Sequence, residues 1–182
     1  KGGRYTIDFA DFERVITENN VKMFILCNPH NPVGRVFSRD ELQRMGEICR
    51  KHNVLVLSDE IHEDFVYAGR HIPFASLSED FTNHSITCTA PSKSFNLAGL
   101  SCSNIIIPSK ELRARFQAEQ NRCSCTTPNN MGLIACRSAY EHGAPWIASL
   151  REYLVGTIDF CEQFAAEHFP QMEFVRPEAT YL

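Results

Sequence analysis

The chain has 182 residues, of which 43% are hydrophobic and 22% are charged, and its formal net charge is −4. This length and composition are those of an ordinary globular domain with a buried core, which excludes the disordered and fibrous classes. The sequence has no basic stripe for nucleic acid, no polybasic patch for a membrane surface, no apolar run of about 18 residues and no signal-peptide pattern in KGGRYTIDF, so we expect a cytoplasmic protein that acts on small molecules.

Short apolar runs alternate with helical patterns along the chain. Residues 21–27, VKMFILC, are typical of a buried strand, and a Pro-rich turn and a helix over residues 38–52 follow them. Ser38 and Glu41 form the S-x-x-E capping box that begins this helix. Further strands are predicted at residues 54–58, 84–90 and 103–108.

The predicted strands are apolar throughout instead of alternating, which favours parallel strands covered on both faces by helices. Helical patterns then occupy residues 110–122 and 129–142. The sequence HGAP at 142–145 breaks the pattern before a long helix over residues 146–168. Residues 172–182 begin an extended segment. We therefore expect an α/β fold.

Eight cysteines are spread along the chain, mostly inside apolar segments, where a thiol behaves as a small hydrophobe. We expect them to be reduced. Cys123 and Cys125 are spaced as half of a metal or redox site, but no second Cys or His pair at zinc spacing completes four ligands. His62, Asp64 and His71 match no metal motif either. The sequence therefore predicts no metal site.

Polar residues follow three successive predicted strands. Asn31 lies in NPHNPVGR, Asp59 in DEIHEDF and Lys93 in APSKSFN. Each has a structural explanation when taken singly, because asparagine forms turns, aspartate caps helices and a lysine is usually solvated. Ligands of open α/β sheets, however, bind outside the carboxyl ends of the strands. The joint placement of the three residues therefore favours a common site at one edge of the sheet.

The three residue types fit the chemistry of one cofactor. A lysine amine can form a Schiff base with an aldehyde, an aspartate can keep a pyridine nitrogen protonated, and an asparagine amide can donate to a phenolate oxygen. Pyridoxal 5′-phosphate has all three of these groups. Its cationic ring is an electron sink for a carbanion at the substrate Cα, so the aspartate matters for deprotonation.

The motifs CNPHNPVGRVFSRDEL, LSDEIHEDF and TAPSKSFNLAGL resemble those of the class I/II, fold type I pyridoxal-phosphate enzymes, in particular their cystathionine β-lyase, or carbon–sulfur lyase, branch. The resemblance runs over nearly the whole chain. It implies that Lys93 is the Schiff-base lysine and general acid/base, that Asp59 pairs with the pyridine nitrogen and that Asn31 contacts the ring O3′. His62 stands where many relatives have a tyrosine that also reaches O3′.

Two features depart from the family pattern. Many relatives bind the cofactor phosphate with a serine before the lysine and an arginine after it, where this sequence has Ala90 and Ser101. Phosphate binding is therefore not assigned to these positions, and Ser92 is the candidate contact beside Lys93. A full family member is also much longer. Its earlier half supplies the phosphate loop and the aromatic residue that stacks on the ring, and its later part supplies the arginine for the substrate carboxylate.

The resemblance implies a partial large domain of fold type I, with a mostly parallel sheet flanked by helices. Residues 1–145 are then part of the pyridoxal-phosphate-binding large domain, and residues 146–182 form the interdomain helix and the start of the small domain. The resemblance also implies a homodimer with sites at the interface and a small amino-acid substrate.

The implied function is a β-elimination lyase that releases a thiol, pyruvate and ammonia from cystathionine-like or cysteine S-conjugate amino acids. An aminotransferase of the same fold is the alternative, because in both kinds of enzyme the lysine that corresponds to Lys93 deprotonates the substrate Cα. The three motifs, together with His62 in place of the usual tyrosine, favour the lyase. A further alternative is an inactive fragment or a non-catalytic subunit portion, because half of the expected active site lies outside the chain.

Overall fold

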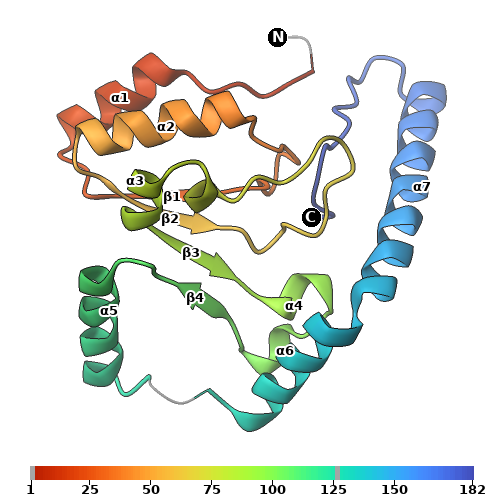
Figure 1. Ribbon diagram of the computed structural model, residues 1–182. Helices are drawn as coiled ribbons and strands as arrows, with labels where there is room; N and C mark the ends of the chain where they lie inside the picture. The colour runs from red at the N-terminus through yellow and green to blue at the C-terminus, as the bar shows by residue number, and fades with distance from the viewer. Residues whose placement is uncertain (1–2, 126–127) are drawn as a thin grey trace.

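The computed structural model describes residues 3–125 and 128–182 (Figure 1). Within these residues the fold contains a four-stranded sheet with the order β1–β2–β3–β4. The first three strands pair in parallel, and β4 pairs antiparallel with β3. The strands are β1 (Met23–Cys27), β2 (Leu55–Asp59), β3 (Ser85–Thr89) and β4 (Asn104–Ile106). The predicted α/β class and mostly parallel sheet are confirmed.

Helices surround this sheet, and four of them lie where the sequence predicts helices. The confirmed helices are α2 (Arg39–Lys51), α5 (Lys110–Arg122), α6 (Asn130–His142) and α7 (Ala144–His168). The capping box of α2 is also confirmed, because Ser38 Oγ accepts a bond from Glu41 N and the Glu41 carboxylate accepts one from Ser38 N. None of the described helices has both the length and the apolar composition needed to cross a bilayer.

Several shorter elements have no counterpart among the predictions. They are α1 (Phe9–Glu18), α3 (Glu79–Asn83), α4 (Pro91–Ser94) and the 3₁₀ turns η1 (Phe74–Ser76) and η2 (Ala98–Leu100). Of these, α1 has a clear local signal, because the side chain of Asp8 caps its first turn by accepting from two backbone amides. The four residues of α4 matter most for function, since they contain Lys93.

The direction of the fourth strand differs from the prediction. The run at 103–108 is interpreted as a parallel strand, but β4 is antiparallel to β3, with Thr89 opposite Asn104 and Thr87 opposite Ile106. A parallel partner needs a crossover connection that returns the chain to the end of the sheet at which the strands begin. Here α4 and η2 stay beside the end of β3 (Figure 1). The chain therefore enters β4 at the same end of the sheet at which it left β3.

The main core lies on one face of the sheet, beneath α1 and α2. Leu26 and Val56 point to this face, where they pack against Leu42 and Met45 of α2. On the opposite face, Met23, Ile25 and Ile105 have exposed fractions of 46%, 65% and 38%. Within the described residues, α1 and α2 pack on the other face of this part of the sheet, and these three side chains are left exposed.

The end of the chain returns to the sheet. After α7, which runs along one side of the molecule in Figure 1, the C-terminal segment lies beside the loop that follows β2, and Val66 and Ala179 form an isolated antiparallel bridge. The expected domain boundary at residue 145 falls at the start of α7. The division into two domains stays a prediction.

Candidate active site

The candidate site lies at the carboxyl edge of the three parallel strands. Cys27 at the end of β1 is paired with Asp59 at the end of β2, and Asp59 is paired with Cys88 of β3. The three loops that follow these strands therefore begin side by side. They contain Asn31, His62 and Lys93 respectively, and Asp59 ends the middle strand, so the structure brings these predicted residues to one edge.

The loop after β1 is held in shape by its own backbone and by a buried amide. Asn28 is fully buried, its backbone N–H donates to Asp59 O at 3.0 Å, and its side-chain oxygen accepts from Phe37 N at 3.2 Å. Gly34 has φ +67°, a conformation that favours glycine, and a Cβ there would lie 2.7 Å from Pro177 Cβ. These contacts fix the turn in which Asn31 is half-buried.

Asp59 is the last residue of β2, and His62 lies in the loop that follows it. The Asp59 side chain lies on the sheet face opposite α2, because Ser58 points into the buried side and strand residues alternate. Asp59 Oδ1 accepts a bond from Ile61 N at 3.2 Å, which turns the chain immediately after the strand. His62 comes next and is only 2% exposed, and its Nδ1 has no hydrogen-bond partner among the described residues.

Lys93 and Ser92 lie in α4, directly after β3. Both residues are half-buried. Within residues 3–125 and 128–182, the Lys93 ammonium has no hydrogen bond or ion pair with another side chain. The amine is thus available for a reaction partner, while Ser92 remains a predicted phosphate contact.

Charged groups of neighbouring loops affect one another's pKa values. Burial lowers the pKa of His62 below its usual value, the positive charge of Lys93 lowers it further, and the negative charge of Asp59 acts in the opposite direction. Burial also raises the pKa of the Cys27 thiol, which receives a hydrogen bond from the Asn31 backbone and faces the charge of Asp59. Burial thus favours the neutral form of the His62 imidazole, and the charges of Lys93 and Asp59 act on it in opposite directions.

A buried carboxylate that sequence reasoning missed holds the loop after β2. Glu60 is 1% exposed, and its two oxygens are bonded to Ser58 Oγ at 2.8 Å, to Phe74 N at 3.0 Å and to His71 Nε2 at 2.8 Å. Removing one partner would leave a buried acceptor unsatisfied, which is costly. Glu60 therefore fixes both ends of the loop that contains His62. Its place next to Asp59 in the DEIH motif was the available signal.

His71 has neighbours other than those considered in the sequence. From the sequence we consider it with His62 and Asp64 and find no metal motif, and the structure places its imidazole beside Glu60 and Glu63, with ligand atoms within 4.8 Å of one another. Burial is the main cause that raises the pKa of Glu63. The geometry is that of a buried hydrogen-bonded pair, Glu60 with His71, flanked by a second carboxyl group.

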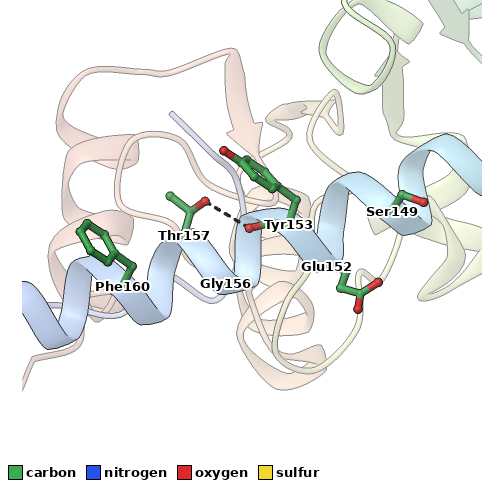
Figure 2. Close-up of a pocket in the computed structure, with 6 residues that line it drawn as sticks. All are labelled: Ser149, Glu152, Tyr153, Gly156, Thr157 and Phe160. Carbon is green, nitrogen blue, oxygen red and sulfur yellow. Dashed lines mark hydrogen bonds between the residues drawn. The ribbon is translucent and has the colours of Figure 1, made fainter.

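A separate groove runs along α7 and does not include the candidate site. Figure 2 shows its lining side chains, all of which come from this one helix. They are Ser149, Glu152, Tyr153, Gly156, Thr157 and Phe160. The hydrogen bond drawn there, from Thr157 Oγ1 to Tyr153 O, is an ordinary bond within the helix. The groove lacks converging groups from separate loops, so we do not assign a reaction to it.

Comparison with known proteins gives a consistent set of matches. The family model described as aminotransferase class I and II matches residues 3–175. The chain is 45% identical to cystathionine beta-lyase PatB of Bacillus subtilis over 100% of its own length and 47% of that protein. An aspartate aminotransferase of Sulfolobus acidocaldarius is 34% identical over 75% of the chain and 33% of that protein.

Solved structures match over the whole fold. Cystalysin from Treponema denticola, whose structure contains pyridoxal 5′-phosphate, superposes with a TM-score of 0.95 at 36% identity, over 100% of this chain and 46% of that one. The pyridoxal-phosphate-bound C–S lyase from Staphylococcus hominis gives 0.91 at 38% identity, over 98% and 45%. The chain thus spans about half the length of the proteins it matches.

The lowered pKa of His62 predicts a pH-dependent stability. Because the unfolded chain takes up the proton more readily than folded His62, the free energy of unfolding should decrease from about pH 7.5 to about pH 5.5, across the ordinary histidine pKa of about 6.5. His62→Gln should show a smaller decrease. Urea unfolding of the full-length gene product at each pH measures the free energy of unfolding. His142→Gln, at an exposed histidine, should behave as wild type, and an unchanged decrease in His62→Gln would contradict the prediction.

Proposed function

Because the chain belongs to the family of class I and II aminotransferases, we propose that it contains the catalytic lysine of a pyridoxal-phosphate-dependent carbon–sulfur β-lyase. The observation that carries this proposal is the placement of Asp59, at the end of β2, and of Lys93, directly after β3, at the carboxyl ends of neighbouring parallel strands. The similarity to PatB, a cystathionine beta-lyase, and to the C–S lyase of Staphylococcus hominis supports the reaction class.

The residues present fit the cofactor. When bound, pyridoxal phosphate supplies an electron sink for the pair left on Cα when a proton is removed. The Lys93 amine, which has no side-chain partner in the described residues, is the group that would hold the cofactor aldehyde. Asp59 would keep the pyridine nitrogen protonated. The Asn31 amide and the unpartnered nitrogen of His62 are the candidate donors to the ring O3′, and Ser92 is the candidate phosphate contact.

The reaction uses Lys93 as both base and acid. In the proposed β-elimination, an S-substituted cysteine and one water give a thiol, pyruvate and ammonia. Lys93 Nζ takes the proton from the substrate Cα, and the electron pair left there forms a Cα–Cβ double bond as the Cβ–S bond breaks and its pair leaves with sulfur. Lys93 Nζ then gives the proton to the departing thiolate, which leaves as a thiol. Asp59 acts throughout as a fixed negative charge. The neutral state of His62 keeps a second positive charge away from the Lys93 amine.

An aminotransferase is the second candidate, and its support is the match to the aspartate aminotransferase of Sulfolobus acidocaldarius. Both reactions need Lys93 to remove the Cα proton, and they differ in the next step. A lyase expels sulfur from Cβ, whereas an aminotransferase moves the proton to the cofactor. The higher identity to PatB, 45% against 34%, favours the lyase.

We also infer a homodimer that acts on a small amino acid in the cytoplasm. On α6, the apolar side chains of Met131 and Ile134 have exposed fractions of 69% and 65%. Exposed apolar groups of this size are typical of interaction surfaces. The eight cysteines are free thiols, as in proteins of a reducing compartment.

Replacing Lys93 tests the covalent attachment. Borohydride reduction of the full-length gene product loaded with pyridoxal phosphate should leave a pyridoxyl label on the peptide with Lys93, and Lys93→Ala should abolish the label. Mass spectrometry of the digested protein locates it. Lys110→Ala, at an exposed lysine at the start of α5, should keep the label. A label on another lysine in the wild-type protein would contradict the assignment.

Replacing Asp59 separates cofactor attachment from turnover. Asp59→Ala should lower kcat by orders of magnitude while borohydride labelling of Lys93 persists, because a one-unit pKa change is about 1.4 kcal/mol and loss of a close opposite charge shifts a pKa by about 1 to 3 units. Steady-state kinetics measures this loss. Asp40→Ala, at an exposed aspartate of α2, is the matched control. Near-normal turnover in Asp59→Ala would show that the pyridinium role is wrong.

The reaction type is tested with two substrate mixtures. The full-length gene product should convert cystathionine to pyruvate, ammonia and a free thiol, measured by a coupled pyruvate assay and a thiol reagent. The second mixture contains an amino acid and 2-oxoglutarate. Glutamate from the second mixture, with no thiol from the first, would assign the protein as an aminotransferase instead.

A further inference from the structure

The helical turn that contains Lys93 is too short to fix its own geometry. Helix α4 has only four residues, and no side chain caps its N-terminus. Isolated helices of this length are not stable, because nucleation costs more than one or two hydrogen bonds return. The orientation of the Lys93 backbone must therefore be set by the parts of the chain that contact α4.

Tyr181 contacts this turn from the C-terminal segment. Its hydroxyl donates a hydrogen bond to Lys93 O at 3.2 Å, across 88 positions of sequence. Its ring packs edge-on against Phe65, with centroids 4.8 Å apart, and against His62 at 6.4 Å. Burial raises the pKa of Tyr181, so the hydroxyl keeps its proton as a donor. One side chain thus touches both the imidazole and the backbone of the reactive lysine.

The segment that holds Tyr181 is tied to two other loops of the site. Thr180 N donates to Phe65 O at 2.9 Å, and Ala179 N donates to Gly34 O at 3.0 Å. Thr180 has φ +65°, an unusual conformation for a β-branched residue that is sustained only when surrounding contacts impose it. This backbone turn directs Tyr181 toward α4. The segment therefore connects the loop after β1, the loop after β2 and the turn after β3.

Asp64 contacts α4 from another direction. Ser94, which is 2% exposed, donates from Oγ to Asp64 Oδ2 at 2.5 Å. Asp64 lies in the loop after β2, only two residues beyond His62. The serine is the neighbour of Lys93, so this bond holds the turn against the loop that contains the imidazole. A hydrogen bond to a carboxylate is stronger than one between neutral groups.

The junction of α6 and α7 packs against the end of α4. Trp146 Nε1 donates to Ser94 O at 3.2 Å, and a Cβ at Gly143 would lie 2.1 Å from Phe95 Cε1. Glycine is therefore required at 143 for this close approach. None of these contacts involves Lys93 Nζ. The backbone around Lys93 is bonded on several sides, while its amine has no side-chain partner among the residues that the structure describes.

We propose that Tyr181 and Asp64 are positioning residues for Lys93. Tyr181 fixes the carbonyl of Lys93, and Asp64 fixes the hydroxyl of the next residue, so together they set the direction in which the amine points. The proposal rests on the proposed function, because it supposes that Lys93 binds the cofactor. It goes beyond that function by assigning roles to two residues that do not touch the reacting atoms.

The expected change in cofactor affinity depends on the fraction of molecules in which Lys93 has the orientation that can bind the cofactor. An apparent dissociation constant rises in proportion as the binding-competent fraction falls. A neutral hydrogen bond contributes about 1 kcal/mol, which corresponds to about a fivefold change in an equilibrium constant. Loss of the Tyr181 hydroxyl should therefore weaken pyridoxal-phosphate binding by up to about fivefold.

The test compares Tyr181→Phe with Tyr153→Phe in the full-length gene product. Tyr153 lies on the groove of Figure 2, is 73% exposed and makes no side-chain hydrogen bond to α4 within the described residues, so its variant should match wild type. Tyr181→Phe should raise the Kd for pyridoxal phosphate about fivefold in fluorescence titration. It should also change the visible circular dichroism of the bound cofactor, which reports its orientation. The ring remains, so packing on Phe65 is kept.

The outcomes separate the two proposals. If wild-type protein binds the cofactor and Tyr181→Phe has the same Kd and spectrum, the positioning role of Tyr181 is wrong, even if urea unfolding shows a loss of stability. If wild-type protein binds no pyridoxal phosphate, the proposed function is wrong and the positioning role with it.

Asp64 is tested by two substitutions that differ only in the acceptor. Asp64→Asn keeps a side-chain oxygen that can accept from Ser94, whereas Asp64→Ala removes it. The Kd for pyridoxal phosphate should increase more in Asp64→Ala than in Asp64→Asn, and Ser94→Ala should add little to Asp64→Ala, because both remove one bond. Wild-type affinity in Asp64→Ala, or independent additive effects of Asp64→Ala and Ser94→Ala, would overturn the role of Asp64.

Discussion

The parallel pairing of β1, β2 and β3 is the constraint on which the candidate site depends. Because Cys27, Asp59 and Cys88 lie side by side, three loops from separate parts of the sequence begin at one edge. Each loop then delivers a different functional group to this edge. Loops are irregular, however, and their polar groups need partners. The buried carboxylate of Glu60 meets this need for the middle loop by bonding both its start and its end.

Much of the fold could be predicted because its signals are local. The capping box at Ser38 and the apolar runs act over a few residues, and they locate α2 and the strands. The direction of β4 could not be predicted in this way, because an apolar run of strand type has the same composition in either orientation. The orientation is set by residues 90–103, which remain at the edge where β3 ends. Similarly, the exposed Ile25 has the sequence pattern of a core residue.

The candidate site also has features with local sequence signals and features that depend on the whole fold. The common location of Asn31, Asp59 and Lys93 could be predicted because each stands at or after the end of a recognisable strand, and the ends of parallel strands converge. Their partners could not. Tyr181 reaches Lys93 across 88 positions, and its place in the PEATYL segment has no periodicity or motif that indicates a contact with the lysine. The sequence groups Asp64 with possible metal ligands, yet its oxygen accepts a bond from Ser94. Long-range hydrogen bonds of single side chains depend on the complete fold.

In the proposed function, Lys93 both holds a cofactor and moves protons, and these two roles make opposing demands on it. Its amine has to reach more than one atom during the reaction, so the four-carbon side chain must remain free to move. Its Cα must stay fixed, because a displacement of the backbone would move every position that the amine can reach. The structure separates these demands between atoms of one residue. Tyr181 holds the Lys93 carbonyl, and Asp64 holds Ser94 beside it, while Nζ is without a side-chain partner in the described residues. Contacts to the backbone therefore provide the precision, and the free side chain provides the reach.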